Sequence, residues 1–146
     1  MRIVLTAISA TLMAACGQAQ TGAATEQTAV TAPSEDTKIM AVMSYADWCS
    51  SCKALDPKVK AVEAANTFKG VEFATLDFTG RDADAFFADA ETLGVGPSMR
   101  AEFGDKVKTG KLYLVSLDTG DVISTIDKSM DEAAITAAIT EAIALS

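Results

Sequence analysis

Two cysteines separated by two residues, Cys49 and Cys52, are the side chains of this sequence best suited to redox chemistry. An apolar run over residues 39–43 precedes them, and apolar residues at helical spacing, Leu55, Val59 and Val62, follow them. This pattern predicts a strand that leads into a helix, with both thiols on the first helical turn. At that place the two cysteines can reach each other.

The start of a helix favours a thiolate, because its first backbone N–H groups are unpaired and the helix dipole is positive there. Such settings lower a cysteine pKa from about 8.5 into the range of roughly 3.5 to 7.5, and attack on a disulfide needs the thiolate. We therefore expect Cys49 to be the nucleophile and Cys52, one turn further on, to be the resolving thiol.

The residues around the two cysteines act on this thiolate in opposite directions. Lys53 adds a favourable charge, whereas Asp47 opposes the ionisation of Cys49. Ser50 and Ser51 offer hydroxyl and backbone N–H groups to the sulfur. The local sequence thus supports a reactive Cys49 without fixing how reactive it is.

The run Trp48-Cys49-x-x-Cys52-Lys53, with Pro57 five residues after the second cysteine, resembles the active-site strand and helix of the thioredoxin superfamily. The resemblance is specific over residues 38–68 and continues to residue 146 as an order of elements. It implies that Trp48 shields the site, that Pro57 kinks the helix, and that the thiols act on thiols and disulfides of other proteins. We expect no cofactor and no resident metal.

One departure from the thioredoxin pattern concerns proton transfer. The family has a buried aspartate six residues before the first cysteine and usually a lysine near it on the next strand. Here Met43 and Thr75 occupy these two positions. Proton transfer to Cys52 must then use water or a nearby group such as Asp47 or Asp77.

A second departure concerns the loop that binds substrate. The family places a cis-proline directly before the strand that we expect at 111–117, where this chain has Gly110. The nearest proline is in the Gly96-Pro97 step, which resembles the family's substrate loop. Either residues 98–109 are inserted after a retained loop, or the loop has been rebuilt without a cis-proline. We favour rebuilding, because cis X-Pro bonds are uncommon in folded proteins.

The segment after Pro97 also leaves two interpretations open. Met99, Arg100 and Phe103 fit a short helix that shapes the rim above the thiols. They fit equally well a surface loop that tucks Phe103 into the core.

The rest of the head alternates strands and helices. Apolar patterns predict strands at 38–45, 71–78, 111–117 and 122–126, and helices at 49–66, 81–93 and 129–143. Asp82 is a candidate cap for the second helix, residues 118–121 predict a hairpin, and Ser129 with Glu132 forms a capping box. The order βαβαββα matches the thioredoxin core, an α/β fold with a central mixed four-stranded sheet and flanking helices.

The chain opens with Met1-Arg2 and an apolar stretch to Ala15 that is too short to span a bilayer, which is typical of an export signal. Small residues before Cys16 make this stretch similar to a bacterial lipobox. We expect residues 1–15 to be a lipoprotein signal peptide and Cys16 to be acylated. The alternative is an ordinary secretory signal cleaved after Ala15 or Ala19.

The segment that follows the leader is rich in Gln, Thr, Ala and Ser and has few large apolar residues. We expect residues 16–37, with Cys16 lipidated, to be a flexible linker, and residues 38–146 to be the thioredoxin-like domain. The alternative is that residues 29–32 pack on the edge of the domain. The predicted location is the periplasmic side of a bacterial membrane, and Gly17 slightly favours the outer membrane.

Composition narrows the function classes further. The chain has 20 acidic and 12 basic residues and a formal charge of -8, which disfavours binding to nucleic acid. It has no histidine, which excludes His-based acid–base and triad catalysis. A four-ligand zinc site would need carboxylates.

Together these patterns predict an exported thiol-disulfide oxidoreductase, with a monomeric head that acts on protein thiols and disulfides and a membrane electron donor as a possible partner. Three alternatives stay open. A structural disulfide between Cys49 and Cys52 would close too small a loop to constrain the unfolded chain much. The others are a redox-inert binding module and a Cu(I) carrier that uses both thiolates with Met43 or Met99.

Overall fold

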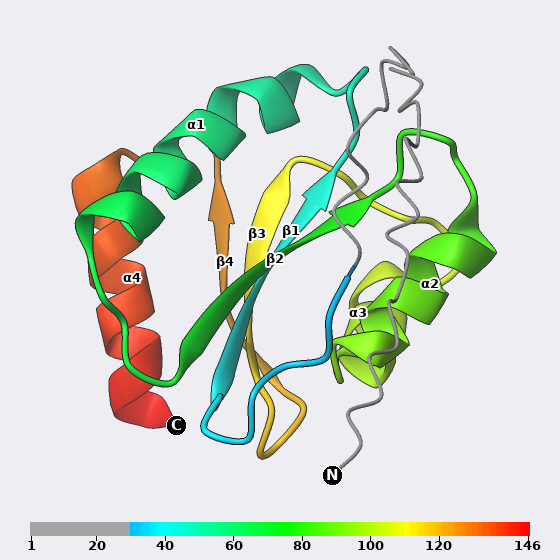
Figure 1. Ribbon diagram of the computed structural model, residues 1–146. Helices are drawn as coiled ribbons and strands as arrows, with labels where there is room; N and C mark the ends of the chain where they lie inside the picture. The colour runs from blue at the N-terminus through cyan, green and yellow to red at the C-terminus, as the bar shows by residue number, and fades with distance from the viewer. Residues whose placement is uncertain (1–29) are drawn as a thin grey trace, which may run out of the picture.

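The computed structural model describes residues 30–146, which form four strands and four helices around one sheet (Figure 1). In chain order these are β1 (Ile39–Tyr45), α1 (Ser50–Ala65), β2 (Val71–Asp77), α2 (Ala83–Thr92), α3 (Gly96–Phe103), β3 (Lys111–Ser116), β4 (Val122–Asp127) and α4 (Glu132–Leu145). The predictions for the signal peptide, for Cys16 and for the linker up to residue 29 lie outside the described residues.

The sheet has the strand order β2-β1-β3-β4. β1 runs parallel to β2 and antiparallel to β3, and β3 runs antiparallel to β4. The predicted α/β class and mixed four-stranded sheet are therefore confirmed. Because β1 is a central strand, the helix that follows it begins at the middle of one end of the sheet.

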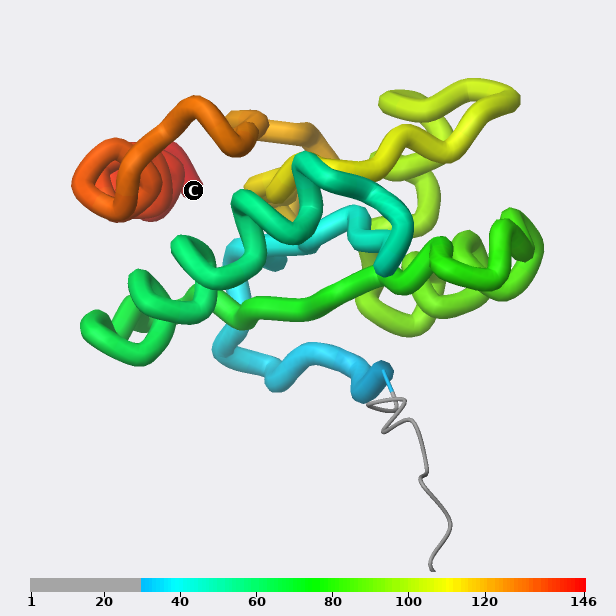
Figure 2. Tube along the Cα trace, turned by 90° about the horizontal axis from the view of Figure 1, so that it is seen from above, coloured from blue at the N-terminus to red at the C-terminus, as the bar shows by residue number. Residues whose placement is uncertain are grey.

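Helices cover both faces of the sheet, which explains the unbroken apolar run of β1. Ile39, Ala41 and Met43 belong to the core between the sheet and the pair α1 and α4. Met40 and Val42 point to the other core, beneath α2 and α3. Figure 2 shows the two helix pairs on opposite sides of the strands.

The order of elements differs from the prediction by one helix, α3, which stands between α2 and β3. Met99 and Phe103 of α3 are 0% and 4% exposed and belong to the core beneath α2, where the Phe103 ring lies edge-on to Tyr113. The segment is thus helical, with Phe103 in the core. Its predicted role at the rim above the thiols is wrong, because burial of these apolar side chains places it against α2.

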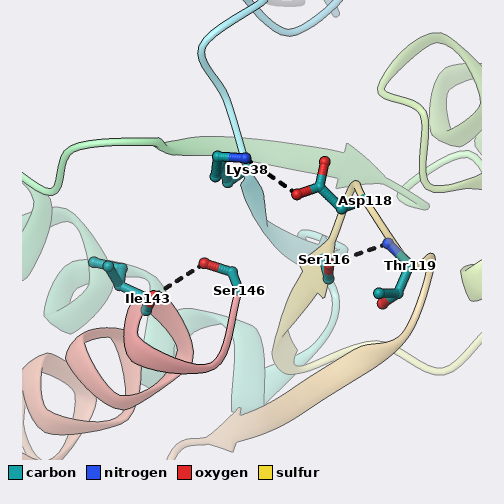
Figure 3. A network of polar contacts seen from close by, with 6 residues as sticks. All are labelled: Lys38, Ser116, Asp118, Thr119, Ile143 and Ser146. Carbon is teal, nitrogen blue, oxygen red and sulfur yellow. Dashed lines mark hydrogen bonds and ion pairs between the residues drawn. The ribbon is translucent and has the colours of Figure 1, made fainter.

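Polar contacts close the end of the sheet that lies opposite the start of α1 (Figure 3). The turn between β3 and β4 confirms the predicted hairpin. Lys38 Nζ lies 3.1 Å from a carboxylate oxygen of Asp118, and Ser116 Oγ accepts a hydrogen bond from the Thr119 N–H. Ser98 of α3 donates to the carbonyl of Gly120 at 2.6 Å, so α3 begins at this end as well.

Two helix caps can be compared with the sequence. Asp82 caps α2, as predicted, by accepting a hydrogen bond from Ala85 N–H at 3.0 Å. The capping box at Ser129 is wrong, because Asp131 caps α4 through Ala134 N–H at 2.8 Å. Ser129 bonds instead to Asp127 in the turn before the helix.

The described part of the linker, residues 30–37, packs along the edge of β2. Val30 contacts the core beneath α2, and Ser34 and Thr37 donate hydrogen bonds to the Glu72 carboxylate. These hydroxyls lower the pKa of Glu72. Over residues 30–146, no helix is both long enough and apolar enough to cross a membrane.

Candidate active site at the start of α1

Cys49 is the N-cap of α1, and its sulfur takes the place of the oxygen that usually caps a helix. Its Sγ accepts a hydrogen bond from the Cys52 backbone N–H at 3.3 Å. No acidic residue stands in the first turn of α1, so no carboxylate there offsets the positive end of the helix. The predicted position of the two thiols, after β1 and on the first turn, agrees with this geometry.

The two cysteines differ in exposure. Cys49 is partly exposed, whereas Cys52 is 0% exposed and lies within the core beneath α1, with its Sγ 3.7 Å from the Ser44 carbonyl oxygen. Both thiols are free in the structure. A partner molecule can therefore approach Cys49 and not Cys52.

The same asymmetry appears in the ionisation of the thiols. Burial opposes ionisation of Cys49, but hydrogen bonds from the Cys52 thiol, the Thr109 hydroxyl and nearby backbone N–H groups outweigh it and lower the pKa of Cys49. Burial and the hydrogen bond to Cys49 raise the pKa of Cys52 to about 11. Cys49 is therefore the more acidic thiol of the pair.

The chain before β3 forms the second wall of the site. Gly110 is buried with a φ of +91°, and its N–H donates to the Ser44 carbonyl at 2.8 Å. A Cβ at Gly110 would lie 2.7 Å from Ser51 Cβ and 3.3 Å from Cys49 Sγ. Only glycine lets the backbone come this close to the sulfur.

This wall bears out the prediction of a loop rebuilt without a cis-proline. All peptide bonds of the described residues are trans, and Gly110 stands beside Cys49. The sequence pointed to Gly110 but not to Thr109, whose side-chain hydrogen bonding lowers the pKa of both thiols. It also missed Ser44, whose hydroxyl donates to the Lys108 carbonyl at 2.5 Å and holds the loop on β1.

The structure places Gly96 and Pro97 far from the thiols, so their prediction as a substrate loop is wrong. Both residues begin α3, and Pro97 occupies the first helical turn, where the lack of an N–H costs nothing. The next residue, Ser98, is bonded to Gly120 at the opposite end of β3 from Gly110. Proline here starts a helix rather than shaping the site.

Trp48 forms the third side of the site and is 46% exposed. Its indole N–H donates to the Thr79 carbonyl at 3.1 Å, and its ring lies edge-on to Phe78. The Arg81 guanidinium lies 4.6 Å from the centre of the indole ring, with Arg81 held at a φ of +59°. The loop after β2 thus fixes Trp48 beside Cys49, and sequence reasoning gave no role to Arg81.

The other predicted residues surround this centre. Asp47, Ser50 and Lys53 are exposed, and Ser51 is partly buried against Gly110. Pro57 lies inside α1, where it removes one backbone donor. Met43 and Thr75 are directly paired between β1 and β2, as the sequence comparison placed them.

The metal alternative loses one of its proposed ligands. Met99 is buried in the core beneath α2 and α3, whereas Cys52 is buried in the core on the other face of the sheet. Within residues 30–146, no three His, Cys, Asp or Glu side chains gather as metal ligands. Met43 shares a core with Cys52 and is 2% exposed.

Fold and site together define a class of α/β protein in which two thiols stand where a central strand passes into a helix. The thioredoxin family model matches residues 21–92 of this chain. The chain belongs to the thioredoxin superfamily. The matched region contains both cysteines and ends before α3 and the Gly110 loop, where the chain departs from the pattern. No curated protein matches the chain significantly.

The lowered pKa of Cys49 predicts how the protein reacts with an alkylating agent. As the pH rises, the iodoacetamide reaction of Cys49 is expected to reach its half-maximal rate below about 8.5, the value of a free thiol. Measuring that rate against pH in Cys52→Ser and Cys52→Ala tests the cause. Serine keeps a donor to the sulfur and alanine does not, so the alanine variant is expected to have the higher midpoint. A midpoint at or above the free-thiol value in both variants would contradict the assignment.

Proposed function

We propose that the protein is an exported, membrane-tethered thiol-disulfide oxidoreductase that exchanges electrons with disulfides and thiols of other proteins. The observation that carries this proposal is the asymmetry of the pair. Cys49 is the accessible, more acidic thiol and Cys52 is the buried, protonated one. Disulfide exchange needs both, a thiolate to attack and a second thiol to resolve.

The reaction runs in two steps. The Cys49 thiolate attacks one sulfur of a partner disulfide, which forms a mixed disulfide and releases the other partner sulfur as a thiolate. Cys52 then loses its proton and attacks Cys49, which forms the Cys49–Cys52 disulfide and releases the second partner thiolate. Two electrons pass from the protein to the partner, and the reverse sequence oxidises a partner dithiol.

The open end of the site suits a protein partner. Trp48, exposed beside Cys49, and the loop with partly buried Thr109 and buried Gly110 flank the reactive sulfur on two sides. A half-exposed indole offers a large apolar contact surface with a polar edge. We assign binding of the segment around the partner's disulfide to these two sides.

The cellular setting of this proposal comes from the first residues of the chain. An acylated Cys16 would anchor the protein to a bacterial membrane and hold the head on the periplasmic side, where disulfides persist. A membrane electron donor would then be the natural source of electrons. Labelling of cells with palmitate, lost in Cys16→Ser, would support the anchor, whereas equal labelling of both proteins would contradict it.

Reduction of insulin by dithiothreitol tests the proposed activity. The protein is expected to accelerate precipitation of the insulin B chain, and Cys49→Ser is expected to remove the acceleration completely, because the attacking sulfur is lost. Thr67→Ala, at an exposed position beyond the far end of α1, is the control for a substitution outside the site. If neither insulin reduction nor oxidation of a dithiol peptide responds to the protein, the proposed function is wrong.

A further inference from the structure

Resolution of the mixed disulfide poses a problem that the two cysteines alone do not solve. Cys52 must lose its proton before it attacks Cys49, yet it is fully buried and its pKa is about 11. At neutral pH only a trace of Cys52 is ionised. If the proposed function holds, a nearby group has to take this proton.

Asp56 is the carboxylate best placed to do so. It follows Cys52 by four residues in α1, and residues four apart share one face of a helix. Its side chain is 23% exposed, and Lys60, a further turn along the same face, holds one carboxylate oxygen at 2.8 Å. Cys52, Asp56 and Lys60 thus follow one another at four-residue steps along one side of α1, with Asp56 between the thiol and the ammonium group.

Tyr45 lines the same groove as Asp56 and packs against the core that contains Cys52. It is the last residue of β1 and is partly buried. Burial raises the pKa of Tyr45, and the charges of Asp56 and then Cys52 raise it further, in line with the place of Tyr45 beside Asp56 in one groove. A neutral phenol can accept one proton and donate another, so its hydroxyl can bridge the two groups.

A groove of about 740 Å³, open to solvent, lies beside Tyr45 and Asp56. Tyr45, Asp56 and Lys60 line it together with Met43 and Thr75, neither of which titrates. The other charged groups near this path are Glu63 and Glu72 in the groove, Asp47 beside Tyr45, and Asp77, which is paired with Tyr45 between the strands. Asp56 lies on the same face of α1 as Cys52 and also lines a groove that is open to solvent.

We propose that Asp56, oriented by Lys60 and bridged by Tyr45, accepts the proton of Cys52 when the mixed disulfide is resolved. The Cys52 S–H proton passes to the Asp56 carboxylate, and the new thiolate attacks the Cys49 sulfur. The Cys49–Cys52 bond forms as the bond from Cys49 to the partner breaks, and the partner leaves as a thiolate. Asp56 then returns its proton to solvent through the groove.

A single-turnover experiment isolates this step. All chains carry Cys16→Ser, so that only the two thiols of the site react. Ellman's reagent converts Cys49 of this full-length chain to a mixed disulfide with release of one thionitrobenzoate, and Cys52 then releases a second. The rate of the second release is measured against pH for the wild type, Asp56→Asn and Tyr45→Phe. Glu63→Gln, which changes a carboxylate further along the same groove, is the control.

Asp56→Asn is expected to slow the second release at least about tenfold at neutral pH, a modest share of what a positioned proton acceptor supplies. The difference in rate between the wild type and Asp56→Asn shrinks as the pH rises toward the pKa of Cys52, because hydroxide then removes the proton directly. Tyr45→Phe slows the same step, and Glu63→Gln does not. The first release, which depends on Cys49 alone, keeps its wild-type rate in every variant.

The outcomes separate this inference from the function on which it rests. A wild-type second release in Asp56→Asn at every pH, or a deficit that appears in Asp47→Asn instead, overturns the role of Asp56 and leaves the oxidoreductase intact. If the wild type itself shows no second release, Cys52 does not resolve the mixed disulfide and the proposed function fails. A deficit that is equal at all pH values would indicate a structural effect and would also overturn the role of Asp56.

Discussion

Replacing Cys52 by serine is expected to leave Cys49 joined to its partner protein by a disulfide that persists. Serine keeps the size of the side chain and a donor to the Cys49 sulfur, so the attacking thiolate survives. It cannot form a disulfide, so the second step of the exchange is lost. The mixed disulfide, short-lived in the wild type, becomes the main form of the protein that has reacted.

The measurement uses cells that make the full-length Cys52→Ser chain. Free thiols are blocked with an alkylating agent, and the chain is followed on gels run without reductant. A band of higher mass that disappears with reductant holds the partner, which mass spectrometry identifies. Cys49→Ser with Cys52→Ser is the control, because it lacks both sulfurs of the site and should form no such band.

This experiment also decides between the proposed function and the binding module. A redox-inert module would give no covalent partner in either variant, even if its fold and its Trp48 surface were intact. If the trapped partner is itself an exported protein that contains cysteines, the result also supports the proposed periplasmic location. The exchange reaction is contradicted if Cys49 of the wild type is found oxidised in cells while the Cys52→Ser chain forms no adduct that reductant releases.

The parts of this fold that the sequence predicts are those set by local patterns. β1 is visible in the sequence as an unbroken apolar run because both of its faces are buried. α1 is visible through the helical spacing of Leu55 and Val59, which both lie in the core. The position of both thiols follows from this strand-to-helix step alone. Asp82 shows as a cap because it directly precedes a helical pattern.

The parts that the sequence does not predict depend on contacts between distant residues. Thr109 reaches the cysteines only because β3 lies beside β1, which brings its first residues next to Ser44. Pro97 stands in a Gly-Val-Gly-Pro run that suggests a substrate loop, yet burial of Met99 and Phe103 makes this segment a helix at the other end of the sheet. Sequence similarity in a short run does not fix its place in space.

Asp56 shows the same limit in the site itself. Its spacing from Cys52 was visible in the sequence, but nothing local distinguishes it from an ordinary surface carboxylate of an amphipathic helix. The proposed role of Asp56 depends on Tyr45, which lies on a strand, and on the groove beside β2. Both exist only in the folded sheet. The sequence therefore pointed to Asp47 and Asp77 as proton acceptors, because they lie nearer the expected strand ends.

The Gly110 wall gives the second large expected effect. Gly110→Ala is expected to destabilise the protein by about 2–5 kcal/mol, from two sources that add. A residue with a side chain costs roughly 1–2 kcal/mol in the left-handed region, and a Cβ 2.7 Å from Ser51 Cβ forces a shift that costs about 1–3 kcal/mol. The same shift moves the loop away from Cys49, so its alkylation rate at neutral pH should fall as the Thr109 donor is displaced.

Gly120→Ala separates the two sources. Gly120 has a φ of +76°, but its nearest neighbour to a new Cβ is Ser98 Oγ at 3.9 Å, an ordinary contact. Unfolding by urea, followed through the fluorescence of the single tryptophan, gives both stabilities. Gly120→Ala should lose only the backbone part and keep the wild-type reactivity of Cys49. If Gly110→Ala and Gly120→Ala have the same stability and the same Cys49 reactivity, the close approach of the Gly110 loop to the sulfur does not stabilise the Cys49 thiolate.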